Sequence, residues 1–204
     1  MSDKARAILF LTVLSLIVGN VLAGISIGLH DRIENNKKLL RVGSLLEVLQ
    51  VDGREQADGV QLLELFQQKV REKDGLPRIY VYEENGQLQA YAFEVSGRGL
   101  WDKIQGLIAV EQDGYTVRGV RFYEQNETPG LGGEIGSVAF ASLFQGKTLK
   151  DQQGTLSIVK AGSVPNLSAS QVDGITGATM TGDAANVLMA SGIEAFLRRM
   201  EEMK

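Results

Sequence analysis

Residues 171–182 place glycines and threonines where a C-terminal helix is expected to begin, and they read QVDGITGATMTG. The first N–H groups of a helix are unpaired and partly positive, glycine lets the backbone approach an anion closely, and threonine adds a hydroxyl donor. This composition predicts a phosphate site. An ordinary glycine turn, with Thr179 or Thr181 capping the helix, uses the same residues, and residue types alone favour that interpretation.

A second glycine-rich loop, residues 126–133, reads NETPGLGG and follows a predicted strand. Its Pro129-Gly130 pair favours a type II turn. Such a loop could press Leu131 against a flat ring while its N–H groups or Thr128 bond the polar edge of that ring. The alternative is an ordinary connection between strands, which residue types alone favour.

Two further positions are candidates for ligand contact. The segment GRGLW, residues 97–101, puts the only tryptophan of the chain, Trp101, beside two glycines, although tryptophan more often packs than stacks on a ligand. Lys160 follows a predicted strand and would neutralise a phosphate, while a solvated lysine is the more common outcome. The glycines of GRGLW do not complete a dinucleotide fingerprint, because position 102 is Asp.

Composition excludes several classes of chemistry. The 204 residues include no cysteine, so thiolate metal sites, iron–sulfur ligation, disulfides and thiol catalysis are absent. Redox chemistry would therefore need a bound cofactor. The net charge of −4, with no Lys/Arg-rich stripe in the folded region, argues against nucleic acid as a partner. No metal site and no catalytic residue are predicted.

The N-terminal region carries an apolar run. From Ala7 to Leu29 no residue is charged, and at about 1.5 Å per residue this stretch matches the hydrocarbon core of a bilayer. It predicts one transmembrane helix. A cleavable signal peptide is the alternative, since Lys4 and Arg6 form a basic start, but the apolar run continues past Ala23 and favours a retained anchor.

The rest of the chain alternates between two periodicities. Helical spacing of apolar residues predicts helices over 35–50, 60–70 and 182–203. Short β-rich runs between glycine turns predict strands over 79–82, 88–95, 107–110, 117–123 and 156–159. The expected fold class is α+β: a single N-terminal transmembrane helix (residues 1–34 with flanks), then one domain (35–204) with a mostly antiparallel sheet and flanking helices.

Taken together, the three glycine loops resemble those of the flavin-carrying NqrC component of the sodium-translocating NADH:quinone oxidoreductase and of its relative RnfG, from the Rnf ferredoxin:NAD oxidoreductase. The resemblance covers nearly the whole chain. Its most specific segments are 97–101, 119–123 leading into 127–135, and 173–181. The last matches the flavinylation motif Asp-x-x-Ser/Thr-Gly-Ala-Thr/Ser. The GRGLW segment and the Gly-Gly-Glu after Pro-Gly-Leu favour the quinone reductase component.

This resemblance implies an FMN-binding domain whose FMN is joined covalently to Thr179 by a phosphoester, which a separate flavin transferase makes from FAD. Thr179 would be a tether, with catalysis belonging to the assembly. The phosphate pocket would be shaped by residues of the motif, namely Asp173, Thr176, Gly177, Ala178 and Thr181, with Lys160 nearby. The isoalloxazine ring would be contacted by Thr128, Gly130, Leu131 and Trp101.

The resemblance also implies a place for the chain in the cell. The domain would face the extracytoplasmic side of the bacterial inner membrane, anchored by a single span, and would exchange electrons with other subunits of a membrane redox complex. Two alternatives stay open. One is a stand-alone membrane-anchored flavodomain, because the motif reports flavin and not partner. The other is a binding module without flavin, in which the glycine loops are ordinary turns.

Overall fold

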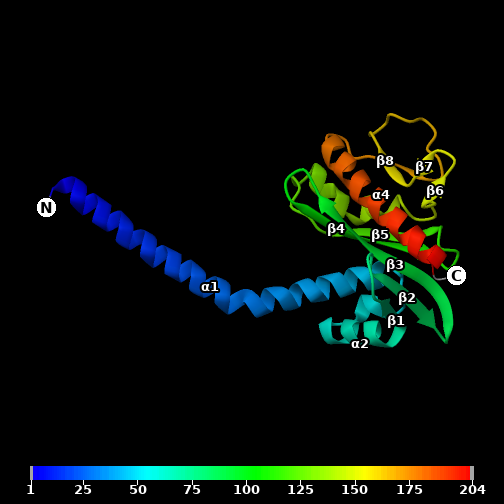
Figure 1. Ribbon diagram of the computed structural model, residues 1–204, viewed down its shortest axis with the longest axis horizontal. Helices are drawn as coiled ribbons and strands as arrows, with labels where there is room; N and C mark the ends of the chain where they lie inside the picture. The colour runs from blue at the N-terminus through cyan, green and yellow to red at the C-terminus, as the bar shows by residue number, and fades with distance from the viewer. Residues whose placement is uncertain (1, 203–204) are drawn as a thin grey trace. The chain divides into compact units, whose positions relative to one another are not determined.

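The structure is a computed structural model that describes residues 2–202. Its first element is the unbroken helix α1, Asp3–Val48, drawn from blue to cyan in Figure 1. Apolar side chains in its first part are exposed, among them Ile8 and Ile27, and α1 is the only helix among the described residues that is long and apolar enough to cross a membrane. The separate helix predicted over 35–50 is wrong. Because no proline or glycine lies between positions 29 and 42, that segment simply continues α1.

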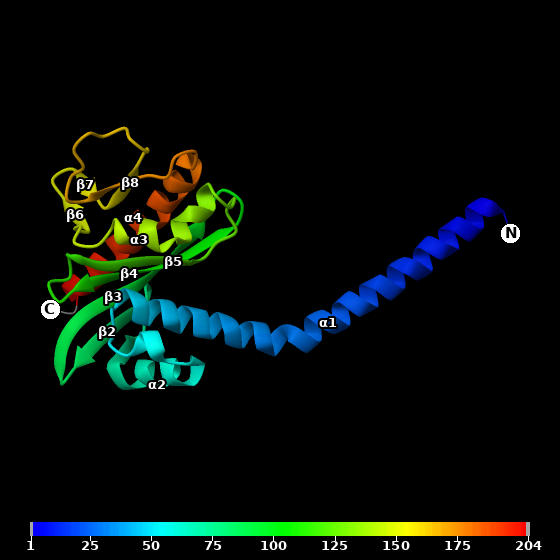
Figure 2. The same cartoon turned by 180° about the vertical axis from the view of Figure 1, so that it is seen from behind.

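The described residues form two compact units that divide between Leu39 and Leu40. The second unit contains a five-stranded antiparallel sheet whose strands follow chain order, from β1 to β5 (Figure 2). The strands are β1 (Val70–Lys73), β2 (Ile79–Glu84), β3 (Gln87–Arg98), β4 (Lys103–Glu111) and β5 (Val117–Glu124). The strands predicted over 79–82, 88–95, 107–110 and 117–123 are confirmed, whereas β1 was not predicted.

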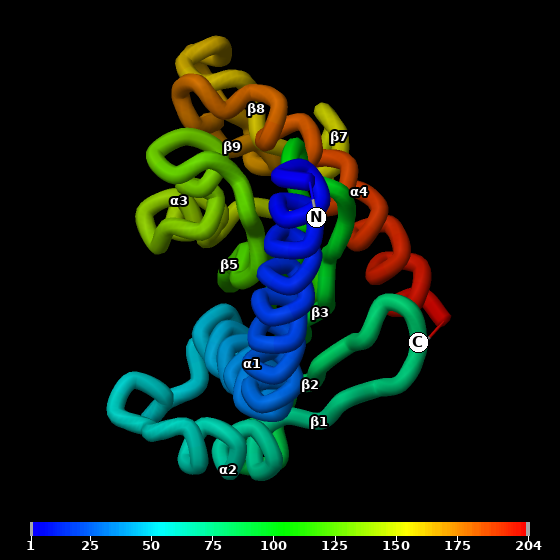
Figure 3. Tube along the Cα trace, turned by 90° about the vertical axis from the view of Figure 1, so that its left-hand side faces the viewer, coloured from blue at the N-terminus to red at the C-terminus, as the bar shows by residue number. Residues whose placement is uncertain are grey.

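The sheet is buried on both faces. Side chains alternate along a strand, so Ile79 and Val81 enter one hydrophobic core while Tyr80 and Tyr82 enter the other. The tyrosine face is covered by the last turns of α1 and by α2 (Gly59–Lys69), which confirms the helix predicted over 60–70. The opposite face is covered by α3 (Val138–Ser142) and α4 (Thr179–Glu202), and α4 and α2 lie on opposite sides of β3 in Figure 3.

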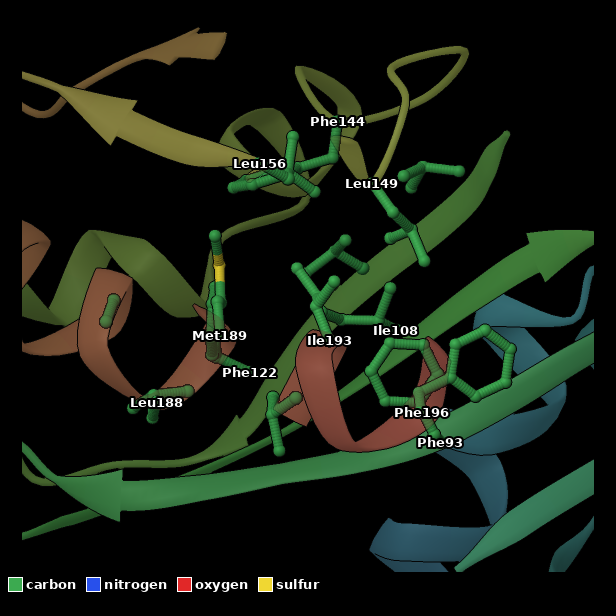
Figure 4. Close-up of a cluster of buried hydrophobic side chains, with 14 of the residues drawn as sticks. Phe93, Ile108, Phe122, Phe144, Leu149, Leu156, Leu188, Met189, Ile193 and Phe196 are labelled. Carbon is green, nitrogen blue, oxygen red and sulfur yellow. The ribbon is translucent and has the colours of Figure 1, made fainter. Parts of the chain in front are cut away.

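Helix α4 packs closely on β3. The rings of Phe93 and Phe196 stack with centroids 4.3 Å apart, and both are fully buried (Figure 4). Two glycines permit the close approach. A Cβ on Gly97 would lie 2.8 Å from the Leu188 Cβ, and one on Gly192 would lie 2.5 Å from the Val95 Cγ1. The helix begins three residues before the predicted start at 182.

The remaining elements connect β5 to α4. They are the 3-10 helix η2 (Gly132–Gly136), the hairpin of β6 (Lys150–Asp151) and β7 (Gly154–Thr155), and the parallel pair of β8 (Ser157–Val159) and β9 (Gln171–Asp173). A further 3-10 helix, η1 (Arg54–Gln56), precedes α2. The strand predicted over 156–159 is confirmed by β8. An N-terminal apolar helix followed by a mostly antiparallel sheet with flanking helices confirms the predicted α+β class.

Candidate functional site

The three glycine-rich loops meet at one end of the sheet. The last residue of β3, Arg98, pairs with Lys103 at the start of β4, and Glu124 at the end of β5 pairs with Gln105. The loops over 99–102 and 125–136 therefore leave the same end of the sheet. Helix α4 runs antiparallel to β3, since Leu188 faces Gly97 and Gly192 faces Val95. Its N-terminus consequently lies at that end as well.

A cavity of about 220 Å³ lies where these loops meet. Each of the three loops contributes to its wall, and the contributing residues are Leu100, Thr128, Leu131, Gly132, Gly177, Ala178, Thr179, Met180 and Thr181. Predicted site residues from the second and the last loop thus share one cavity wall. Leu100, Gly132 and Met180 were not predicted.

Thr179 occupies the start of α4. It is the first residue of the helix and is exposed. Within residues 2–202, no protein acceptor receives the N–H groups of Thr179, Met180 or Thr181, and the next N–H, that of Gly182, donates to the Ala178 carbonyl at 3.0 Å. The helix start therefore presents unpaired donors and the positive end of its dipole beside the Thr179 hydroxyl. Such an arrangement binds anions.

The turn before this site has the predicted form. The Leu131 N–H donates to the Thr128 carbonyl at 3.1 Å, and Gly130 has a φ of 74°, as a type II turn requires. The turn carries Leu131 to the cavity wall, where a Cβ on Gly177 would lie 2.9 Å from its Cδ2 atom. Gly177 also has a φ of 80°, so two loops touch at a position that only glycine fills without strain. Gly130 forms the turn without lining the cavity.

In the GRGLW segment the cavity is lined by Leu100 and not by Trp101. The Trp101 side chain is 69% exposed, while its backbone N–H donates to the Glu127 carboxylate at 3.1 Å. The two glycines of the segment have packing roles. Gly97 admits α4, and a Cβ on Gly99 would lie 2.5 Å from the Glu127 Oε1 atom.

Lys160 and Asp173 lie on the β8–β9 side of Thr179. The parallel register pairs Val159 with Asp173, and the exposed Lys160 and Thr179 line the same small second cavity. Lys160 is therefore placed to neutralise an anion at Thr179. The Asp173 carboxylate accepts the N–H groups of Gly162 at 2.9 Å and Gly174 at 3.1 Å, so it holds the loop together. Thr176 is exposed and lines neither cavity.

The sequence did not single out Glu127. Its residue is only 4% exposed, and its Oε2 atom accepts the Thr181 hydroxyl hydrogen at 2.7 Å. Thr181, predicted as a donor to a phosphate, is itself buried and directs that hydrogen at Glu127 instead, so its role is revised to one of support. An acidic residue beside a Pro-Gly turn is ordinary on a surface, and no local signal announces the burial of Glu127.

An exposed hydrogen bond joins the first two loops. The Asn126 side-chain amide donates to Asp102 at 2.7 Å, and the Lys103 N–H donates to the other oxygen of Asp102 at 2.7 Å. The Asn126 amide and the Lys103 N–H lower the pKa of Asp102, because both bond its ionised form. The same interaction fixes the loop that carries Leu100 relative to the loop that carries Leu131.

The donor set suits a phosphorylated aromatic ligand. Unpaired N–H groups, the Thr179 hydroxyl and Lys160 offer donors and positive charge to a phosphate, while Leu100, Leu131 and Met180 offer apolar contact to a flat ring. Among residues 2–202 no group of three or more His, Cys, Asp or Glu side chains is placed to hold a metal ion. The fold and the site thus define an α+β domain that presents a helix start and an apolar cleft to one ligand.

Comparison with known proteins gives the family. Residues 99–194 match the family model described as FMN-binding domain, a range that contains all three loops from Gly99 onward. The chain belongs to this FMN-binding domain family. Its residues at the helix start fit that family's cofactor, because FMN combines one phosphate with one flat ring system.

Named relatives narrow the comparison. The chain is 37% identical over 142 residues to NqrC of Pseudomonas aeruginosa, the C-type component of a Na(+)-translocating NADH-quinone reductase, covering 65% of this chain and 54% of that protein. It is 38% identical over 114 residues to NqrC of Vibrio alginolyticus, covering 55% and 44%. The chain spans about half the length of the curated relatives it matches.

Solved structures share the fold. The crystal structure of Shewanella oneidensis NqrC matches with a TM-score of 0.68 at 24% identity, covering 83% of this chain and 99% of that one. The crystal structure of the corresponding NADH-quinone reductase component from Parabacteroides distasonis matches with the same score at 22% identity, covering 83% and 95%. The sheet and its flanking helices therefore recur in both proteins.

Proposed function

We propose that this chain carries one FMN, joined covalently to Thr179, and passes electrons as a subunit of a membrane oxidoreductase of the sodium-translocating NADH:quinone reductase type. The observation that carries the proposal is the position of Thr179, exposed at the first residue of α4 and in the wall of a cavity made by three loops. Similarity to NqrC proteins supports the choice of this complex over the Rnf type.

The attachment step would use the Thr179 hydroxyl. Its oxygen would form a bond to the phosphorus of the FMN half of FAD, the phosphoanhydride bond would break, AMP would leave, and the hydroxyl proton would be released to solvent. A separate flavin transferase would catalyse this exchange. The exposure of Thr179 gives such an enzyme access. After attachment, Thr179 would be a tether that keeps the cofactor from being lost.

The chain's residues would then hold the cofactor. The unpaired N–H groups of α4 and the Lys160 ammonium would hold the phosphate, and Leu100, Leu131 and Met180 would shield part of the ring from water. FMN supplies chemistry in one-electron or two-electron steps when bound. The cavity of about 220 Å³ is smaller than usual ligand pockets, which run to roughly 300–1,000 Å³. Part of the ring would therefore stay open to a neighbouring protein of the complex.

The proposed setting is the bacterial inner membrane. Helix α1 is long and apolar enough to serve as a single-pass anchor, with residues 1–34 as anchor and flanks and 35–204 as the domain, on the extracytoplasmic side. The chain would not be catalytic alone. Its partners would be other subunits of the redox complex and, during maturation, the flavin transferase.

Intact mass spectrometry tests the attachment. The full chain, produced with and without a flavin transferase, should gain the mass of FMN minus water only with the transferase, and it should fluoresce through denaturing electrophoresis. Thr179→Ala should abolish both signals, while Thr179→Ser should keep them because serine retains the hydroxyl. Thr176→Ala is a matched control from the same loop. A mass gain that persists in Thr179→Ala would overturn the assignment of the acceptor.

Association with other subunits needs a separate experiment. Affinity purification of the full chain from detergent-solubilised membranes should recover multi-span subunits together with it. Recovery of a flavinylated chain with no such partners would support the stand-alone flavodomain instead.

A further inference from the structure

Glu127 is a buried carboxylate that none of the described residues pairs with a cation. It is 4% exposed, and within residues 2–202 it forms no ion pair. Both carboxylate oxygens act as acceptors, Oε1 from the Trp101 N–H at 3.1 Å and Oε2 from the Thr181 hydroxyl at 2.7 Å. An ionised carboxylate accepts at both oxygens, and burying one is costly unless such bonds are made.

The space around this carboxylate is reserved by glycines of two loops. A Cβ on Gly99 would lie 2.5 Å from the Glu127 Oε1 atom, and a Cβ on Gly132 would lie 2.4 Å from the Thr181 Oγ1 atom. Because real side chains do not tolerate such distances, both positions must lack a side chain for the Glu127–Thr181 bond to form. The glycines of the GRGLW and PGLGG segments thus serve this buried contact.

We infer that Glu127 is a positioning residue that joins the three loops and sets the charge beside the cofactor, an inference that rests on the proposed function. Through Thr181 it holds the first turn of α4, two residues from the attachment point. Through the Trp101 N–H it holds the loop whose neighbouring residue, Leu100, lines the cavity. One side chain therefore fixes the tether and part of the apolar wall relative to each other.

The negative charge of Glu127 has a second effect. Thr181 lines the cavity, so the carboxylate that accepts its hydrogen lies directly behind the cavity wall. A fixed negative charge at this place opposes the arrival of an electron in the cavity, and it is weakly screened because it is buried. Glu127 should therefore lower the reduction potential of a flavin held there.

Two substitutions separate shape from charge. Glu127→Gln keeps the side-chain size and removes the charge, and Thr181→Val keeps the size of threonine and removes the hydroxyl. Thr181→Ser should restore the bond. Glu134→Gln, from the exposed part of the same loop, is the matched control.

The first measurement uses the full chain without flavin. Amide hydrogen exchange at Trp101 should be at least tenfold faster in Glu127→Gln, whose amide is a weaker acceptor, and unchanged in Glu134→Gln. In a double-mutant cycle, Glu127→Gln with Thr181→Val should destabilise the chain by less than the sum of the single variants, because both remove the same bond. Wild-type exchange at Trp101 together with strict additivity would overturn the inference.

The second measurement uses the flavinylated chain. The initial rate of attachment should fall at least tenfold in Thr181→Val and recover in Thr181→Ser, and this pair decides the positioning role if Glu127→Gln does not fold. In flavinylated Glu127→Gln the equilibrium should shift about tenfold toward the reduced form, or about 59 mV for a one-electron couple. An unchanged potential overturns the charge effect, and wild-type attachment in Thr181→Val overturns the positioning. If the wild type gains no flavin, the proposed function fails, while the exchange measurement still tests the contact.

Discussion

The two faces of the sheet are packed in different ways. On the α4 face, apolar side chains meet across a close helix–strand contact that Gly97 and Gly192 permit. On the opposite face, Tyr80 places its hydroxyl between charged groups, donating to Glu94 at 2.9 Å and accepting from Arg41. Burial, and then the Glu94 carboxylate, raise the pKa of Tyr80.

Only one of these faces leads to the candidate site. Helix α4 lies on the apolar face and begins at Thr179, whereas the polar contacts of the other face have no member in the cavity wall. The difference indicates that dense apolar packing holds the site in place, while the polar contacts contribute to stability without setting its geometry. Three predictions test this difference.

The largest effect is expected in the apolar core. Phe196→Ala removes the partner of the Phe93 ring and leaves a cavity under α4, so it should lower the free energy of unfolding by about 3–5 kcal/mol. Urea unfolding of the full chain in detergent measures this change. Val187→Ala, on the exposed side of the same helix, is the control and should change little. A loss below about 1 kcal/mol for Phe196→Ala would contradict the assigned role of this face.

A smaller effect is expected on the opposite face. Tyr80→Phe removes one hydroxyl but leaves Arg41 and Glu94 able to pair with each other, so the free energy of unfolding should fall by about 1 kcal/mol. The rate of flavin attachment to Thr179 should stay at the wild-type level. If attachment slowed as strongly as in the Thr181→Val variant, the two faces would be coupled and the distinction between them would fail.

The smallest effect is expected in the exposed bond between Asn126 and Asp102, which belongs to neither face. Because folding lowers the pKa of Asp102 from its ordinary value of 3.8, the stabilisation is present above that value and is lost as the pH falls through the folded-state pKa. Asn126→Ala should lower the unfolding temperature slightly at neutral pH, and the difference from wild type should vanish in strong acid. Asn166→Ala, an exposed asparagine in another loop, should show no such pH dependence.

Much of the sheet could be predicted because one physical constraint shaped its sequence. A strand with two buried faces needs β-rich residues over its whole length, and β2 to β5 show this pattern between glycine turns. Strand β1 has one buried residue, Val70, followed by three exposed charged residues. Its conformation depends on pairing with β2, which no local pattern reports.

The site was predictable loop by loop but not as an assembly. Thr179 and the Pro-Gly turn carry local chemistry that a sequence displays. The burial of Glu127 depends instead on the register of β3 to β5 and on where α4 lies, which are long-range properties. Gly182 was predicted to begin the helix, yet its N–H already bonds the Ala178 carbonyl, so the helix starts within the motif itself.

The packing of α4 on β3 also limits what can be excised from the chain. The family match begins at residue 99 and ends at 194, so it omits β1 to β3 and the last turns of α4. A fragment cut at those limits would lose Phe93 and Phe196 and would leave Leu188 and Ile193 without the strand that covers them. The segment that sequence comparison recognises is therefore smaller than the unit that can fold, and the recognised segment borrows its stability from residues outside it.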